Sequence, residues 1–180
     1  NHPATVFAKY NRGRKPEFQI RTSIVQEKES RRVEKMALRP EGKAHIASFR
    51  KKYEQLSKLY KRVNVLEPEF SQDGNTVRFP FLTGITLAER LGQEIRNEKA
   101  PVKEINQALE ALFEVNGGQI SAFFVTPEFT EVFGKIPEFS DEALAVSNID
   151  GLFENMMLAE GKLYALDYEW VFDFPVPLSF

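Results

Sequence analysis

The sequence has 180 residues, 42% of them hydrophobic and 28% charged, which is typical of one globular domain with its own core. It contains no cysteine, so disulfides, thiol catalysis and thiolate metal sites are excluded. The formal net charge of −2 gives no bulk attraction to nucleic acid, and no apolar run is long enough for a transmembrane helix.

The N-terminal part predicts an antiparallel meander of three strands. Apolar and polar residues alternate in 4–10, and two further strands are expected at 17–26 and 31–38. The polar, turn-rich segments 11–16 and 27–30 separate them.

A long helix and a hairpin are predicted next. The helix opens near Pro40 and extends to about Tyr60, because its apolar residues recur at three–four spacing. Strands follow at 64–70 and 76–82, joined by a turn at 72–75. The apolar residues of the helix are Ile46, Phe49, Tyr53, Leu56 and Tyr60.

The second half predicts mainly helices, followed by a small hairpin. Helices are expected at 85–96, from Pro101 to the glycine pair at 117–118, and at 126–134. Two short strands are expected within 156–166, around Glu160-Gly161. The apolar stripe of the middle helix consists of Val102, Ile105, Leu109, Leu112 and Phe113.

The two ends suggest a piece of a longer protein. The sequence begins Asn1-His2-Pro3 and remains apolar in 171–180. The terminal apolar residues could belong to the core or could dock a further domain, and the docking face is the interpretation that we favour.

One group of polar residues has the pattern of phosphoryl-transfer chemistry. Asp150 and Asn155 are separated by four residues and run into an apolar strand, and Asp167 follows Asn155 by twelve residues. Phosphoryl transfer needs one Asp to orient the acceptor hydroxyl, and an Asn and a second Asp to hold Mg²⁺ against the phosphates. An Asp-x4-Asn pair alone is expected by chance about 0.25 times in this composition, and the added Asp lowers this to about 0.02.

This stretch resembles the catalytic loop and metal-binding hairpin of the protein-kinase-like superfamily. The ending LDYEW is similar to the choline-kinase and aminoglycoside-phosphotransferase branch. The longer pattern SNIDGLFENMML…YALDYEWVFDFPVP resembles kinase-like modules of bacterial surface-glycan (O-antigen) assembly proteins, which occur beside methyltransferase or glycosyltransferase domains. The resemblance covers nearly the whole chain in the order of elements, and its motifs are sharp only in 147–177.

The resemblance implies an α+β, two-lobed fold: a five-stranded antiparallel N-lobe in 1–82 and a reduced, helical C-lobe with the catalytic hairpin in 83–180. It implies a transferase that uses ATP and Mg²⁺ to phosphorylate a hydroxyl of a sugar or glycan. The alternative is a weak or inactive kinase-like scaffold attached to a methyltransferase or glycosyltransferase. The location that follows is cytoplasmic, at the inner face of the membrane through partners.

The resemblance also implies roles for single residues. Asp150 would be the base, and Asn155 and Asp167 the Mg²⁺ ligands. Lys35 would contact the α- and β-phosphates and pair with Glu54, which follows it by 19 residues; Glu41 is the alternative partner.

Two further contacts with the nucleotide follow by resemblance. The turn at Arg12 and Gly13 stands where the family has its phosphate loop, although it has one glycine rather than a glycine-rich run. Backbone groups near Phe79 and Phe81 would meet the adenine at a hinge. Asn148 stands where the family usually has His, and Glu169 could pair with a basic residue or lie near the metal.

Overall fold

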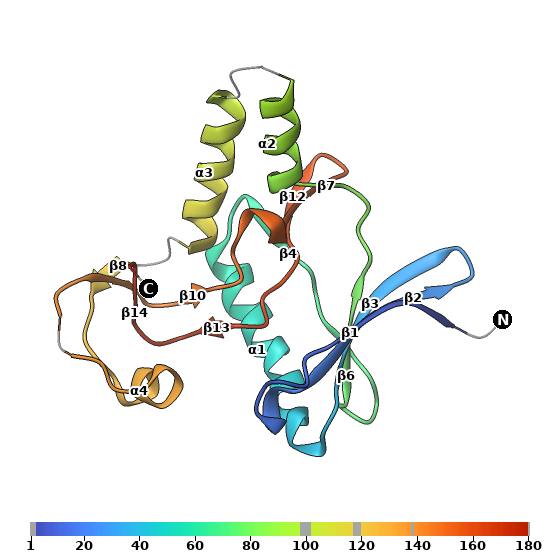
Figure 1. The fold of residues 1–180 in the computed structure, drawn as a ribbon, viewed down its shortest axis with the longest axis horizontal. Coiled ribbons are helices and arrows are strands. Elements are labelled where there is room, and N and C mark those ends of the chain that lie inside the picture. The colour runs from blue at the N-terminus through green and yellow to red at the C-terminus, as the bar shows by residue number, and fades with distance from the viewer. Residues whose placement is uncertain (1–2, 98–101, 117–119, 138, 180) are drawn as a thin grey trace. The chain divides into compact units, whose positions relative to one another are not determined.

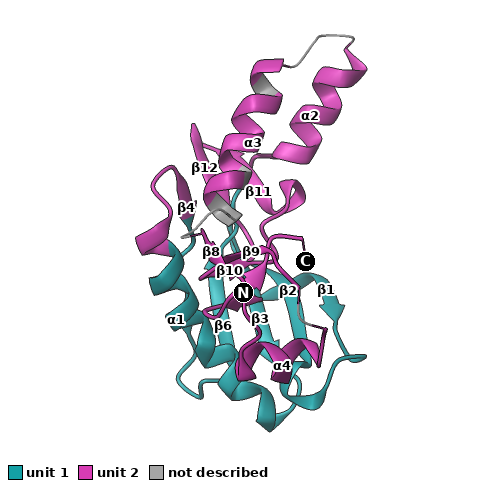
Figure 2. Cartoon of the chain, turned by 90° about the vertical axis from the view of Figure 1, so that its left-hand side faces the viewer, with its two compact units in different colours: residues 1–56, 65–83 teal, residues 57–64, 84–180 magenta. Residues whose placement is uncertain are grey.

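The computed structural model describes residues 3–97, 102–116, 120–137 and 139–179 (Figure 1). Two compact units make up the chain: unit 1 comprises residues 1–56 and 65–83, and unit 2 comprises residues 57–64 and 84–180 (Figure 2). The described residues form a mixed α+β protein with antiparallel sheets and four α-helices, as predicted in its coarse outline. None of the described helices is both long and apolar enough to cross a membrane.

Unit 1 is built on a five-stranded antiparallel sheet, so this part of the prediction is confirmed. The strand order is β1-β2-β3-β6-β5. The bounds are β1 Ala4–Tyr10, β2 Ile20–Glu27, β3 Ser30–Ala37, β5 Glu69–Phe70 and β6 Thr76–Pro80. The predicted helix is also confirmed: a 3-10 turn, Pro40–Gly42, leads into α1, Lys43–Leu59.

The core of unit 1 lies between α1 and one face of the sheet. The apolar stripe of α1 is buried, with Ile46, Phe49 and Leu56 each at most 1% exposed. The ring of Phe49 packs edge-on against Phe79 of β6, with 5.7 Å between centroids. Burial of these apolar side chains provides most of the free energy that holds α1 on the sheet.

Two strands predicted in the first 82 residues differ from the structure, and proline explains both differences. The strand expected at 17–26 begins at Ile20, because Pro16 starts a 3-10 helix at Pro16–Phe18. The strand expected at 64–70 is two short strands, β4 (Val63–Val65) and β5, separated around the buried Pro68, which has no N–H for a ladder.

Unit 2 contains three helices among its described residues. They are α2 Leu87–Arg96, α3 Val102–Asn116 and α4 Pro127–Phe133. Thr86 and Glu89 form a reciprocal capping box at the start of α2. Thr126 caps α4, and Gly134, with φ of 86°, ends it, as the sequence predicts. Pro101 and Gly117-Gly118, the expected bounds of α3, lie outside the described residues.

The strands of unit 2 are short and more numerous than predicted. The expected hairpin is present as β11 (Met156–Ala159) and β12 (Lys162–Ala165), and β7 (Ile85–Thr86) pairs with β11. Two strand groupings were not predicted. They are the pair β10 (Ser147–Asn148) with β13 (Val171–Phe172), and the three-stranded sheet of β8 (Ile120–Ala122), β9 (Glu142–Leu144) and β14 (Val176–Pro177).

The C-terminal segment packs in part on its own unit, in line with the alternative that it belongs to the core. Val176 is 4% exposed in β14, which pairs with β9. The rings of Phe172 and Phe174 both contact Phe133 of α4. Sheet pairing and an aromatic cluster therefore cover part of this apolar segment.

Candidate functional site

Strand pairing at both ends brings the loop around Asp150 next to the segment after Asp167. The loop begins at β10, which pairs with β13 in the register Asn148–Val171. It ends at a 3-10 turn, Phe153–Asn155, that leads directly into the β11–β12 hairpin. The two sequence segments of the motif are thus tied together within unit 2.

Hydrogen bonds join the three predicted residues into one assembly. The Asn155 side-chain amide donates to the Asp150 carbonyl (2.8 Å), and the Leu166 N–H donates to the Asn155 carbonyl (2.8 Å). The Asp150 carboxylate accepts the Trp170 N–H (2.9 Å), and the Asp167 carboxylate accepts the Glu169 N–H (3.1 Å). The loop and the hairpin therefore hold each other in position.

Asn148 is the centre of this assembly, a role that the sequence did not indicate. Its side chain is fully buried, donates to the Asp167 carbonyl (3.3 Å) and accepts the Asp150 N–H (3.2 Å). It also hydrogen-bonds the Tyr60 side chain, and the pKa of Tyr60 is raised mainly because the phenol is buried. One amide side chain thus contacts both aspartate segments.

Glu114 of α3 holds the turn that follows α1, immediately after Tyr60. One carboxylate oxygen of Glu114 accepts the N–H groups of Lys61 (2.6 Å) and Arg62 (2.8 Å). The sequence predicted Tyr60 only as the last residue of an apolar stripe. Its partner lies far along the chain, so local pattern could not reveal the contact.

The oxygen atoms at this position are of the kind that Mg²⁺ prefers. Because the Asn155 amide nitrogen donates to Asp150, its side-chain oxygen points elsewhere and has no donor among the described residues. An amide oxygen and the Asp167 carboxylate are hard ligands that fit Mg²⁺, whose remaining ligands are usually water and phosphate. No group of three or more His, Asp or Glu that could hold a metal occurs in the described residues, so a purely protein-made cage is absent there.

Glu169 is also part of this region. It is 3% exposed, and its N–H donates to the Asp167 carboxylate. A buried carboxylate two residues from a predicted metal ligand fits either of the two roles considered for it.

Lys35 lies on the sheet face that α1 covers. It is on the central strand β3, between Thr22 and Val77, and is 6% exposed. Its ammonium is 5.6 Å from the centroid of the Phe49 ring. A buried lysine on an inner strand is uncommon, which makes Lys35 the strongest candidate of unit 1.

The structure does not pair Lys35 with Glu54. Glu54 is exposed on α1 and has no hydrogen bond or ion pair within the described part of the chain. Its position on the helix explains this, since it lies about 120° from the centre of the apolar stripe at 100° per residue. Glu41 is also exposed.

Arg12 and Gly13 lie in the exposed turn between β1 and β2. The Gln19 side-chain amide donates to the carbonyls of Arg12 (3.0 Å) and Arg14 (2.8 Å), so the turn is braced from inside. A Cβ on Gly13 would meet nothing within 4 Å. A cavity of about 370 Å³ is adjacent, lined by Arg12, Gln19, Leu38 and Arg39.

The predicted hinge residues, Phe79 and Phe81, already make contacts within unit 1. The Phe79 ring is buried against Phe49, and the Phe81 N–H donates to the Arg31 carbonyl (3.3 Å). The next two backbone amides, those of Leu82 and Thr83, have no hydrogen-bond partner among the described residues. If this segment binds a base, these amides are better placed to do so than Phe81.

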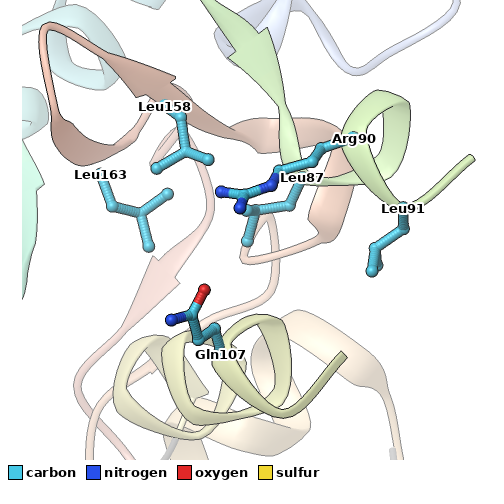
Figure 3. A pocket seen from close by; sticks show the side chains of 6 residues that line it. All are labelled: Leu87, Arg90, Leu91, Gln107, Leu158 and Leu163. Carbon is cyan, nitrogen blue, oxygen red and sulfur yellow. The ribbon is translucent and has the colours of Figure 1, made fainter. Parts of the chain in front are cut away.

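A small apolar pocket of about 180 Å³ adjoins the hairpin in unit 2 (Figure 3). Leu158 and Leu163 of the hairpin form one wall, and the Gln107 amide of α3 points toward it from the opposite side. The other lining residues are Leu87, Arg90 and Leu91 of α2. None of the predicted catalytic residues lines this pocket, so the pocket is distinct from the assembly around Asp150.

Comparisons with known proteins give one structural likeness. No protein-family model matches the chain, and no curated protein matches its sequence. The chain is similar in structure to macrolide 2'-phosphotransferase MphH from Brachybacterium faecium, in its apoenzyme form, with a TM-score of 0.44 and 10% identity. The match covers 91% of this chain and 66% of that one, so this chain spans just under two thirds of its neighbour. The neighbour is a phosphotransferase.

Proposed function

We propose that this chain is an ATP- and Mg²⁺-dependent phosphotransferase that acts on a hydroxyl of a sugar or glycan in bacterial surface-polysaccharide assembly. The observation that carries the proposal is the hydrogen-bonded assembly of Asp150, Asn155 and Asp167, centred on Asn148. Those three residue types, held rigidly in one unit, match the requirements of phosphoryl transfer.

In this mechanism Asp150 orients the acceptor. Its carboxylate is fixed by the Trp170 N–H and its backbone by Asn148 and Asn155. The acceptor hydroxyl would donate a hydrogen bond to this carboxylate. The carboxylate would take the proton as the hydroxyl oxygen bonds to the γ-phosphorus of ATP and the bond from that phosphorus to ADP breaks. A positioned acid–base group of this kind contributes about 10²–10⁴-fold to the rate.

Asn155 and Asp167 hold the metal, and Lys35 contacts the phosphates. When bound, Mg²⁺ supplies charge neutralisation for the phosphate oxygens. Asn155 precedes β11 and Asp167 follows β12, so both residues flank the open end of one hairpin. The buried ammonium of Lys35 favours an anionic ligand over water.

The test combines nucleotide binding with transfer. Isothermal titration with ATP, with and without Mg²⁺, should show Mg²⁺-dependent binding that Asp167→Ala abolishes. Asp150→Asn should bind ATP nearly as well but transfer the γ-phosphate to saccharide acceptors about 10²–10⁴-fold more slowly. Glu154→Gln is the matched control, because Glu154 is exposed in the same loop. Unchanged ATP affinity in Asp167→Ala would contradict the site assignment.

A second candidate is a nucleotide-binding module without transfer activity, attached to a methyltransferase or glycosyltransferase. Two observations favour it: Glu54 is exposed rather than paired with Lys35, and the turn at Arg12 has a single glycine. Mg²⁺-dependent ATP binding without ATP hydrolysis or transfer to any saccharide of the panel would select this alternative. Both candidates work in the cytoplasm, at the inner face of the membrane through their partners.

A further inference from the structure

Helix α3 has a buried face with small residues and a separate, exposed apolar face. Ala108 and Ala111 are 1% and 6% exposed and pack toward their own unit, where α3 contacts β10 and α2. At 100° per residue, four large apolar side chains lie on another side of the helix, centred about 135° from these two alanines. These are Val102 (61% exposed), Ile105 (39%), Leu109 (40%) and Phe113 (73%).

The exposed side chains form one continuous stripe. Both views show α2 and α3 side by side, extending beyond the strands of unit 2 (Figures 1 and 2). The stripe has the three–four spacing of a helix-packing face, although nothing in the described part of the chain covers it. Single exposed apolar residues are ordinary, whereas a contiguous stripe marks an interaction surface.

The charges beside the stripe indicate what covers it. Lys103 and Glu110 lie on the same flank of the stripe, about 100° from its centre, and are separated by two helical turns. Across an antiparallel helix pair, such a flank faces the same flank of the partner helix in reverse order. With a two-fold axis near residue 107, Lys103 then faces Glu110 of a second copy, twice over.

The apolar side chains fit the same arrangement. The two-fold axis that pairs Lys103 with Glu110 also sets Val102 opposite Phe113 and Ile105 opposite Leu109 of the second copy. In a parallel pair equivalent residues meet at the same height, and the opposite charges are two turns apart. We propose that α3 binds α3 of a second copy of this chain in an antiparallel, two-fold symmetric dimer.

The charge pattern is also unsuited to a membrane surface. Helices that lie on membranes carry mainly Lys and Arg on the polar side, whereas α3 carries Glu110 and Glu114 there. Glu110 forms an ion pair with Arg62 of its own chain (3.1 Å) through one carboxylate oxygen. The other oxygen can still accept a hydrogen bond from a lysine.

The contact is small. A helix of 15 residues is about 22 Å long, so the paired surface falls among the smaller interfaces, which are transient. We therefore expect a dissociation constant in the micromolar range.

Sedimentation velocity of the 180-residue chain from about 1 to 200 μM tests the proposal without any nucleotide, so its result is independent of the proposed function. The wild type should pass from monomer to dimer. Leu109→Glu should remain monomeric, with an unchanged circular dichroism spectrum because Leu109 faces solvent in the monomer. Val132→Glu on α4, where Val132 is 49% exposed, is the matched control and should dimerise like the wild type.

A charge swap tests the antiparallel register. Lys103→Glu should weaken the dimer at least tenfold, and Lys103→Glu with Glu110→Lys should restore it. Failure of this rescue would overturn the proposed pairing. A wild type that stays monomeric at 200 μM would overturn the dimer, whether or not it then sediments with phosphatidylglycerol vesicles. Leu109→Glu that dimerises like the wild type would overturn it as well.

Discussion

Helices α1 and α3 carry apolar residues at the same three–four spacing, yet one of the two stripes is buried and the other is exposed. In α1 the stripe is buried against a sheet, and Phe49 is 1% exposed. In α3 the stripe faces away from the unit, and Phe113 is 73% exposed. The comparison teaches that periodicity identifies an apolar face, whereas the partner of that face depends on other elements.

The difference has a physical origin in what each helix offers its own unit. The sheet beside α1 presents large apolar side chains such as Ile20 and Val77. The apolar stripe of α1 is buried against this sheet. Helix α3 presents Ala108 and Ala111 instead, and small side chains let a helix approach its neighbours closely. Val102, Ile105, Leu109 and Phe113 lie on a different face of α3 and are exposed.

The largest expected effect is the loss of the α1 stripe. Phe49→Ala should lower the free energy of unfolding of unit 1 by about 3–5 kcal/mol, because it removes a buried ring and leaves a cavity. Phe113→Ala on α3 should change it by less than about 0.5 kcal/mol at protein concentrations too low for a dimer. Hydrogen exchange of peptides from β6 and α3 measures each effect separately. Equal losses in the two variants would remove the distinction between the helices.

The polar end of the α1 stripe comes next in size. Asn148→Ala should destabilise unit 2 by about 1–3 kcal/mol, because the Asp150 N–H and the buried Tyr60 hydroxyl lose a partner. Tyr60→Phe removes only the hydroxyl and should cost about 1 kcal/mol. Asn64→Ala is the control, since the exposed Asn64 amide donates to the Leu163 carbonyl and to no other group in the described residues. Urea unfolding followed by exchange of the β10 peptide measures the ranking, which a larger loss for Asn64→Ala would reverse.

A smaller effect is expected at the helix that precedes α3. Thr86→Ala removes the side-chain acceptor for the Glu89 N–H at the start of α2 and should cost about 1 kcal/mol. Thr86→Ser keeps the hydroxyl and should retain most of the stability. Faster exchange in α2 than in α3 would show that the cap acts locally, whereas equal acceleration in both would show that the two helices unfold together.

The smallest effect concerns the sheet face opposite α1. Burial raises the pKa of Glu34, but hydrogen bonds and charges from Arg32 and Arg78 outweigh this and hold it below its ordinary value. Because the pKa is lower in the folded state, Glu34 stabilises unit 1 above the ordinary carboxyl pKa, and this contribution is lost as pH falls through the folded pKa.

Glu34→Gln should therefore lose at most about 1 kcal/mol at pH 7, given solvent screening, and should show a shallower decline in stability from about pH 5 to pH 3. Thermal unfolding across this pH range measures the slope. A decline as steep as that of the wild type would mean that other carboxylates account for it.

Much of the fold followed from local sequence signals. The α1 stripe, the Thr126 cap and the β11–β12 hairpin were all predicted, because each depends on residues within one or two turns of the chain. The strands β8, β9 and β14 were missed. Each has only two or three residues, which is too short for alternation to appear, and their pairing joins distant segments.

The candidate site divides in the same way. The spacing of Asp150, Asn155 and Asp167 predicted one group of residues, and the structure joins them through hydrogen bonds within unit 2. The structure does not pair Lys35 with Glu54. The number of residues between a strand and a helix does not determine which side of the helix faces the lysine. Glu54 faces solvent.

The sequence by itself determined where helices begin and which of their faces are apolar, because caps and periodicity act between residues a few positions apart. Only the tertiary structure decided that the α1 stripe would be covered and the α3 stripe exposed, and that Asn148 would meet Tyr60. Contacts between distant segments leave no local pattern in the sequence. They form only in the complete fold, where surfaces pack together and buried polar groups find hydrogen-bond partners.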